Sequence, residues 1–171
     1  MRLFARETKV PAEVVEAGGL ERGDRVLGHA RDGERWLLGT RRAFVVVDGG
    51  AATVRLAWES VQAADWDRET ELLTVSEVGQ FGRPRSTWTY RLADPAVFLQ
   101  VVRERVTASI VLQRGHLVSG KRGLKVIGRR SPEGGPITWM HEYDPGLDPD
   151  DPEVAGVAAA LLQQARADVG E

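Results

Sequence analysis

The chain has 171 residues, with 23 lysines and arginines against 25 aspartates and glutamates, and its net charge is −2. This length suits one ordinary domain or a small domain with an extension, and the charge gives no overall attraction to nucleic acid or anionic lipid. The absence of cysteine excludes disulfides, thiolate metal sites and cysteine nucleophiles. Because residues 1–19 lack the apolar core of a secretion signal and no apolar run could span a bilayer, we expect a cytoplasmic protein.

Strand patterns begin after an irregular or briefly helical lead-in over residues 1–19 and recur at short intervals, each bounded by turn residues. Asp32-Gly33 supplies the positive-φ residues of a tight hairpin between the first two strands. Val54, Leu56 and Trp58 alternate with other residues, which predicts a strand with one wet face. Seven strands are predicted before any long helix, over residues 25–31, 34–39, 43–47, 53–58, 61–66, 72–78 and 87–92.

The pattern then changes to the period of a helix. Asp94 is an N-cap acceptor, and Pro95 after it has its φ already fixed for a first helical turn. The apolar residues that follow predict an amphipathic helix of about four turns. We expect its apolar stripe to cover the open end or an edge of the preceding sheet.

The C-terminal part is predicted to form a strand pair and a helix. The strands are expected over residues 123–130 and 137–143, after a strand or irregular stretch near 110–113. Asp150 or Asp151 begins the last helix, and Glu153 is placed to complete a capping box. A strand pair and one helix bury little apolar surface alone, so we expect this segment to pack on the first part. The predicted buried face of the helix comprises Val154, Val157, Ala158, Leu161, Leu162 and Ala165.

Three consecutive segments, TRRAFVVVDGG, TVRLAWESVQAADWD and ELLTVSEV, resemble bacterial pleckstrin-homology-like and GRAM-like domains. In those families a threonine and basic residues precede an apolar strand, which is followed by W/Y-x-x-I/V and then by x-D…L-x-V. The resemblance covers roughly residues 20–110. The matching residues are Thr40, Arg41 and Arg42, then Trp58 and Val61, then Asp67, Leu73 and Val75.

This resemblance implies an α+β fold, in which a seven-strand antiparallel barrel is capped by a helix. The expected organisation is a lead-in (1–19), a barrel with its capping helix (20–112) and a C-terminal β-hairpin and helix (113–171). The whole layout, ending in YDPGLDPDDPEV, also resembles an actinobacterial protein family, which implies no activity.

Members of pleckstrin-homology-like families often bind phosphoinositides through basic residues around the first hairpin. Here that hairpin reads HARDGERW, so Arg31 and Arg35 are offset by Asp32 and Glu34. This departure favours a protein-binding or scaffold role over phosphate binding.

Residues 115–122, GHLVSGKR, keep the glycine and lysine spacing of a phosphate-binding loop. Arg122 replaces the hydroxyl residue that would hold magnesium, and the following GLKVIGRR is strand-like, so no helix N-terminus faces a phosphate. We therefore predict a turn between strands, and no cofactor.

Metal binding is not indicated either. In YDPGLDPDDPE, Pro149 occupies the sixth position where an EF-hand loop needs glycine, so a turn followed by an N-cap is predicted. His29, His116 and His141 are too scattered to suggest a site by spacing. We expect no enzyme, although a site assembled from distant loops stays open as an alternative.

Six basic residues and no acid lie between residues 114 and 130, whereas residues 142–153 are strongly acidic. Strand alternation places Lys125, Ile127 and Arg129 on one side, opposite Leu124, Val126 and Gly128, so part of this charge faces solvent. No aromatic residue lies within the stretch for base stacking, and the acidic run could neutralise it. The basic residues are Arg114, Lys121, Arg122, Lys125, Arg129 and Arg130.

These observations predict a non-enzymatic interaction or scaffold module that binds a protein partner. A nucleic-acid-associated accessory protein using residues 114–130 is the alternative. Exposed sheet edges leave self-association open. On charge alone, the residues expected to contact an acidic partner are Arg41, Arg42, Lys121, Arg122 and Lys125.

Overall fold

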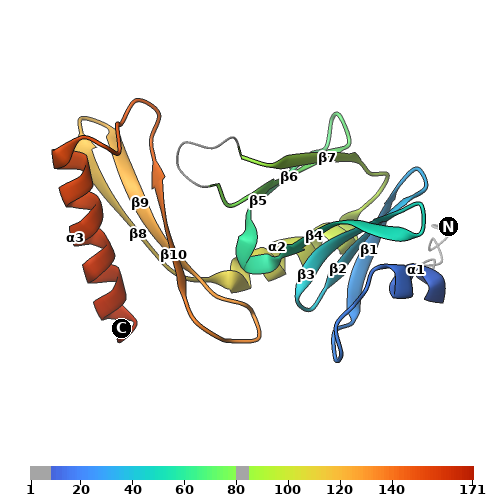
Figure 1. Ribbon diagram of the computed structural model, residues 1–171. Coiled ribbons are helices and arrows are strands. Elements are labelled where there is room, and N and C mark those ends of the chain that lie inside the picture. Colours follow the sequence, from blue (N-terminus) through green and yellow to red (C-terminus); the bar gives the residue numbers. More distant parts are fainter. Residues whose placement is uncertain (1–8, 80–84) are drawn as a thin grey trace, which may run out of the picture. The chain divides into compact units, whose positions relative to one another are not determined.

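The computed structural model describes residues 9–79 and 85–171 (Figure 1). Within these residues it is an α+β structure with three antiparallel sheets and three α-helices. The chain divides into two compact units, Met1–Val106 and Thr107–Glu171, and each is described by itself.

The first unit contains the seven predicted strands, whose ends agree with the sequence prediction to within two residues. They form a four-stranded sheet in the order β1-β2-β3-β4 and a three-stranded sheet in the order β5-β6-β7. The two sheets are not closed into the predicted barrel, and the chain passes from β4 to β5 through a 3₁₀ turn, η1 (Trp58–Ser60). The strands are β1 (Val26–Asp32), β2 (Arg35–Thr40), β3 (Ala43–Asp48), β4 (Ala51–Ala57), β5 (Val61–Asp67), β6 (Leu72–Glu77) and β7 (Thr87–Arg91).

Thr40 and Trp58, two residues of the quoted family pattern, have structural roles at the β2–β3 turn. The buried Thr40 hydroxyl accepts from the Ala43 N–H at 2.9 Å and donates to Asp24 at 2.8 Å. The Trp58 indole N–H donates to the Thr40 carbonyl at 2.9 Å. These bonds join the turn to η1 and satisfy polar groups that burial would otherwise leave unpaired.

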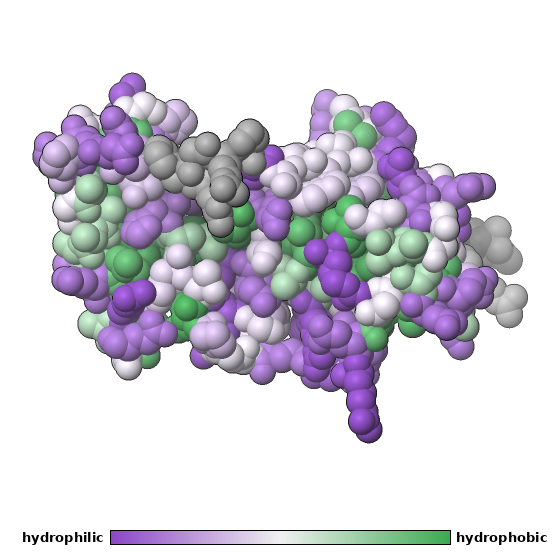
Figure 2. Space-filling view, viewed as in Figure 1, coloured by the Kyte–Doolittle hydropathy of each residue, from purple (hydrophilic) through white to green (hydrophobic). Residues whose placement is uncertain are grey.

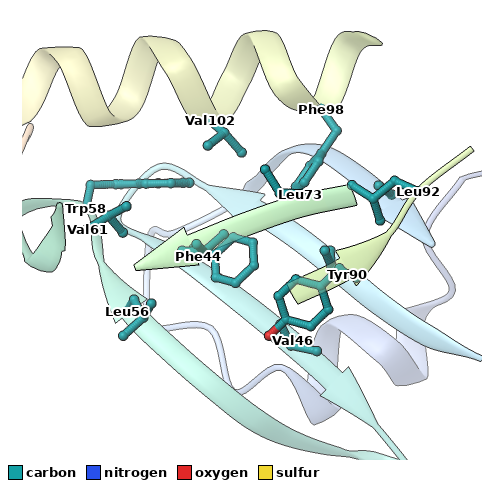
Figure 3. Close-up of a cluster of buried hydrophobic side chains, with 13 residues drawn as sticks. Phe44, Val46, Leu56, Trp58, Val61, Leu73, Tyr90, Leu92, Phe98 and Val102 are labelled. Carbon is teal, nitrogen blue, oxygen red and sulfur yellow. The ribbon is translucent and has the colours of Figure 1, made fainter. Parts of the chain in front are cut away.

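The core of the first unit is formed by the inner face of the four-stranded sheet, strands β6 and β7, and helix α2 (Ala96–Ser109) (Figure 3). Phe44 lies at its centre, with its ring 5.9 Å from that of Tyr90 and 6.3 Å from that of Phe98. The cluster comprises Ala30, Leu37, Phe44, Val46, Leu56, Trp58, Val61, Leu73, Val75, Tyr90, Leu92, Phe98 and Val102.

Two glycines allow α2 to approach the sheet closely. Gly28 of β1 and Gly39 of β2 are partners in the ladder, and a Cβ at either would lie 3.0 Å from a methyl group of Val101. A side chain larger than hydrogen would therefore push the helix away from the sheet. Helix α2 has 14 residues, which matches the predicted four turns, but it begins at Ala96, because Asp94 takes a left-handed φ of 46°.

The outer face of the four-stranded sheet is apolar as well. Trp36, Leu38, Ala43, Val45 and Val47 form a second buried cluster on this face. It is covered by the segment that contains the short helix α1 (Ala12–Ala17), through Val10, Val14 and Ala17. The sequence runs WLL and AFVVV thus reflect strands that are buried on both faces.

The second unit is a three-stranded sheet with a helix on one face. The sheet has the order β10-β9-β8, and the helix contacts β8 and β9. The predicted strand pair is thus too small, because the stretch near residue 110 continues as a long strand paired with β9 up to Ser119. The elements are β8 (Ile110–Ser119), β9 (Arg122–Arg129), β10 (Thr138–Tyr143) and α3 (Pro152–Asp168).

Helix α3 begins as predicted: the Asp151 carboxylate accepts from the Glu153 N–H at 2.8 Å, and Pro152 is in the first turn. Its apolar stripe packs with Leu124 and Val126 of β9 in a core that belongs to this unit. The expectation that the C-terminal segment packs on the first part concerns the arrangement of the two units and stays a prediction. The fully buried residues of the helix are Val154, Ala158, Leu161 and Ala165, while Val157 and Leu162 are partly buried.

Candidate interaction site

Helix α1 is a thin cover for an apolar sheet face. It has six residues, none of them fully buried, and Pro11 before it provides no side-chain cap. Its C-terminal end is held instead by Arg55 of β4, whose guanidinium donates to the carbonyls of Gly18 and Gly19. Isolated helices of this length are unstable in water, so α1 depends on these contacts.

Two open recesses are lined partly by α1 or the residues beside it. One has a volume of about 340 Å³, and we call it the acidic recess because its charged residues are Glu13 and Glu34. The other has a volume of about 390 Å³, and we call it the basic recess because Lys9 and His29 are its charged or titratable residues. The acidic recess is lined by Glu13, Val14, Ala17, Glu34, Trp36, Val47, Gly49 and Gly50, and the basic recess by Lys9, Val10, Val15, Val26, Leu27, Gly28 and His29.

The floor of the acidic recess includes Trp36, which is packed between other side chains. Trp36 is 8% exposed, and the Arg31 guanidinium lies 4.3 Å from the centre of its ring. Arg31 also donates to the Gly33 carbonyl at 2.8 Å, which fixes the guanidinium over the ring. The His29 ring is tilted against Trp36 at 5.6 Å.

The predicted offset of the first hairpin's arginines by acids is found for Arg35 only. Arg35 donates to Asp48 at 3.2 Å and contacts Asp32 at 3.4 Å, while Arg31 lies over Trp36. Arg31 keeps its charge there, but both guanidinium groups are held by contacts within the unit.

The five residues predicted to contact a partner fall into two groups in different units. Arg41 and Arg42 form the β2–β3 turn of the first unit, where Arg42 pairs with Glu21 at 2.7 Å. Lys121, Arg122 and Lys125 belong to the second unit. The structure therefore does not bring the five together within one unit.

The basic stretch of the second unit is divided by strand alternation, as predicted. Lys125 is exposed on the face opposite α3, whereas Arg129 on the same face is 2% exposed and donates to Ser109 Oγ at 2.9 Å. On the α3 side, Arg114 pairs with Asp168 at 2.5 Å. The charge is thus spread over both faces, and part of it is neutralised, so it does not form a continuous track for a phosphate backbone.

The segment GHLVSGKR forms the end of β8 and a hairpin turn at Gly120, whose φ is 58°. In the acidic run, Asp144 accepts from the Gly123 N–H at 2.7 Å and Asp148 accepts from the Asp150 N–H at 3.0 Å. Asp148 thus serves the predicted turn before α3, whose cap is Asp151, whereas Asp144 bonds to Gly123 near the start of β9. Among the described residues, no group of three or more His, Cys, Asp or Glu could hold a metal ion.

Sequence reasoning missed the two recesses. The signal was present in WLL and AFVVV, because consecutive apolar residues in a hairpin strand point to both faces, so the second face needs a cover. The sequence does not say which segment provides that cover. Elsewhere in the described chain, the only exposed large apolar residues are Val97 and Leu117. Figure 2 shows apolar residues interspersed with hydrophilic ones on the face in view.

No helix in the described part of the chain is long and apolar enough to cross a membrane. Comparison of the chain with protein-family models, with curated proteins and with solved structures found no match.

Proposed function

We propose that this chain is a non-enzymatic interaction module that binds a segment of a protein partner in the recesses beside α1. The observation that carries the proposal is a pair of open recesses of about 340 and 390 Å³ that contain partly exposed apolar residues, such as Val14 and Ala17 in one and Val10 and Val15 in the other. Accessible apolar surface rimmed by polar residues is typical of sites for other proteins.

The chemistry of the recesses supports a peptide rather than a reacting substrate. Val14, Ala17, Trp36 and Val47 contribute apolar surface, and the charged residues lie at the exposed margin. Peptide recognition commonly combines a rigid apolar floor, which provides affinity, with a few charges that provide orientation.

We also propose that the first unit is a pleckstrin-homology-like domain. Seven antiparallel strands in sheets of four and three, followed by a helix that packs on their core, support this assignment. The bond between Trp58 and Thr40 supports it further, because it gives two residues of the quoted pattern a structural role.

Lys121, Arg122 and Lys125 stay candidates for contacting an acidic segment of the same partner. Lys121 and Lys125 are exposed, whereas the Arg122 guanidinium lies against Gly146. The division of the basic stretch over two faces gives the nucleic-acid alternative no specific support.

The test is a selection of peptides displayed on phage against the full immobilised chain, followed by fluorescence anisotropy with synthetic copies. Val14→Lys places a charge in the apolar contact between α1 and the sheet, and Ala12→Lys places the same charge on the exposed side of the same helix. We expect at least about tenfold weaker binding for Val14→Lys and no change for Ala12→Lys.

Amide chemical-shift changes in the wild-type chain on titration with the selected peptide provide a second measurement. This measurement does not depend on how the Val14 variant folds. Shifts centred on the residues that line the recesses support the proposal. Failure to enrich any peptide, or shifts centred elsewhere, would overturn it.

A further inference from the structure

The two recesses differ in charge. Glu13 on α1 and Glu34 in the β1–β2 turn line the acidic recess, which has no lysine, arginine or histidine in its lining. The basic recess has Lys9 and His29 and no acid. A ligand that enters the acidic recess is therefore selected for positive charge.

The two glutamates are available to a ligand. Within residues 9–79 and 85–171, no ion pair or hydrogen bond engages either side-chain carboxylate, and both residues are exposed. The nearby acids behave differently, because Arg35 already pairs with Asp32 and Asp48. Arg35 thus leaves Glu34 without an opposite charge, and Arg31, the other arginine of this hairpin, lies over the Trp36 ring and donates to the Gly33 carbonyl.

Between the glutamates the recess is apolar and its margin is open. Trp36 and Val47, which are 8% and 3% exposed, form its base, and the partly exposed Val14 and Ala17 supply most of the apolar surface that a ligand can reach. Gly49 and Gly50 have no side chains to narrow the margin, and a Cβ at either would meet nothing within 4 Å. The site therefore offers an apolar surface beside two carboxylates.

A lysine or arginine side chain matches this arrangement. Its methylene stem can cover apolar surface while its charged head stays at the water-exposed rim. A bare cation would leave the apolar part of the recess uncovered, and an apolar side chain would leave Glu13 and Glu34 without a partner.

We propose that the acidic recess binds a lysine or arginine side chain of the partner segment, with the stem against Val14 and Ala17 and the head between Glu13 and Glu34. This inference rests on the proposed function, since it names the residue type by which the partner is recognised. Through Glu13, helix α1 would then contribute to the choice of ligand as well as to the fold.

The experiment uses the selected peptides and copies in which each basic residue is replaced by methionine. Glu34→Gln and Glu13→Gln are each expected to weaken binding of the basic peptide about threefold, and the double variant about tenfold, at low salt. The methionine copies should be insensitive to both changes. Glu16→Gln, which removes an exposed charge from the same helix outside the recess, is the matched control.

A further arm reverses the charge. Glu34→Lys should weaken binding of the basic peptide further and strengthen binding of a copy with glutamate in place of the basic residue. High salt should reduce all of these differences, because the charges are exposed.

The outcomes separate the two proposals. If peptides bind at the recesses but the glutamate variants bind them as the wild type does, the proposed function stands and this inference is wrong. Calorimetric binding of Mg²⁺ or Ca²⁺ that is lost in the double variant would also overturn it, in favour of a metal site. If no peptide is enriched, both proposals fail.

Discussion

The two faces of the four-stranded sheet are built from the same strands but are covered in different ways. The inner face packs against the 14-residue helix α2 and against strands of the second sheet, and it belongs to a cluster of 13 buried residues. The outer face has a cluster of five, covered by partly buried residues in and around the six-residue helix α1.

This difference shows that burial of a strand residue does not by itself give its contribution to stability. Leu37 and Leu38 are neighbours in β2, both are 0% exposed, and they point to opposite faces. The inner face has a close fit, in which Val101 occupies the space above two glycines. The outer face has open recesses lined partly by α1 or the residues beside it.

The largest expected effect compares these two leucines. Leu37→Ala should lower the free energy of unfolding by about 3–4 kcal/mol, because the surrounding elements cannot close the cavity. Leu38→Ala should cost about 2 kcal/mol, since the short cover can move inward and water reaches the margin. Urea unfolding followed by tryptophan fluorescence measures both. Equal costs would show that the outer face is as tightly packed as the inner one.

The close approach of α2 is tested at Gly39. Gly39→Val should cost about 2–3 kcal/mol, because its side chain overlaps the position of Val101, and Gly39→Ala should cost less. Combining Gly39→Ala with Val101→Ala should recover part of the loss, because the second change removes the methyl group at 3.0 Å. Strictly additive losses in the double variant would contradict the close contact.

Much of the secondary structure could be predicted from local sequence signals. Gly33 takes a positive φ of 60° in the first hairpin, as predicted, but the loop is Gly33-Glu34, because Asp32 is the last residue of β1 and pairs with Arg35. Asp151 caps α3 as expected. Such signals act within a few residues, so they fix where strands and helices begin and which neighbours pair.

The outer side could not be predicted in the same way, because its cover and its recesses depend on contacts between distant segments. Val14 reaches β3 and Arg55 reaches Gly19 without any local signal for either contact. The partner-contact residues are predicted from charge alone, and charge does not indicate in which unit of the fold a side chain lies. The length of β8 was underestimated because Gly115 and His116 interrupt the apolar pattern although both continue the ladder with β9.

The inner core contains a titratable hydroxyl, that of Tyr90, which makes it sensitive to alkaline pH. The Tyr90 hydroxyl is buried with no hydrogen-bond partner among the described residues, and burial raises the pKa of Tyr90 to about 12. Below pH 10 the tyrosine is protonated in both the folded and the unfolded state. Between about pH 10 and 12 the unfolded state loses its proton first, so the free energy of unfolding should fall by about 2–3 kcal/mol from this group.

Tyr90→Phe removes this titration. At pH 7 the variant should be at least as stable as the wild type, because no hydrogen bond is lost and an unpaired polar atom is removed. The stability difference between variant and wild type, measured by urea unfolding from pH 8 to about 12, should grow in favour of the variant. Parallel curves for the two proteins would show that the hydroxyl is hydrated in the folded state.

The smallest expected effect on overall stability concerns the attachment of α1. Arg55→Ala removes the donors to the Gly18 and Gly19 carbonyls, and we expect it to lower the free energy of unfolding by about 1 kcal/mol or less, since the bonds lie near the surface. Its main effect should be local: amides of α1 should exchange with solvent several-fold faster, while those of β2 and β3 keep their protection.

Arg91→Ala is the matched control, because Arg91 also donates to a backbone carbonyl, that of Thr70 at 2.9 Å, in another part of the unit. It should leave the exchange of α1 unchanged. If Arg55→Ala also leaves the α1 amides protected, the apolar contacts of Val10, Val14 and Ala17 are sufficient to hold the helix. The outer face would then be covered more stably than its recesses indicate. If the α1 amides exchange faster while those of the strands stay protected, the two faces of the sheet differ in local stability. The inner face is then a stable core, and the cover of the outer face can open to accommodate a bound segment.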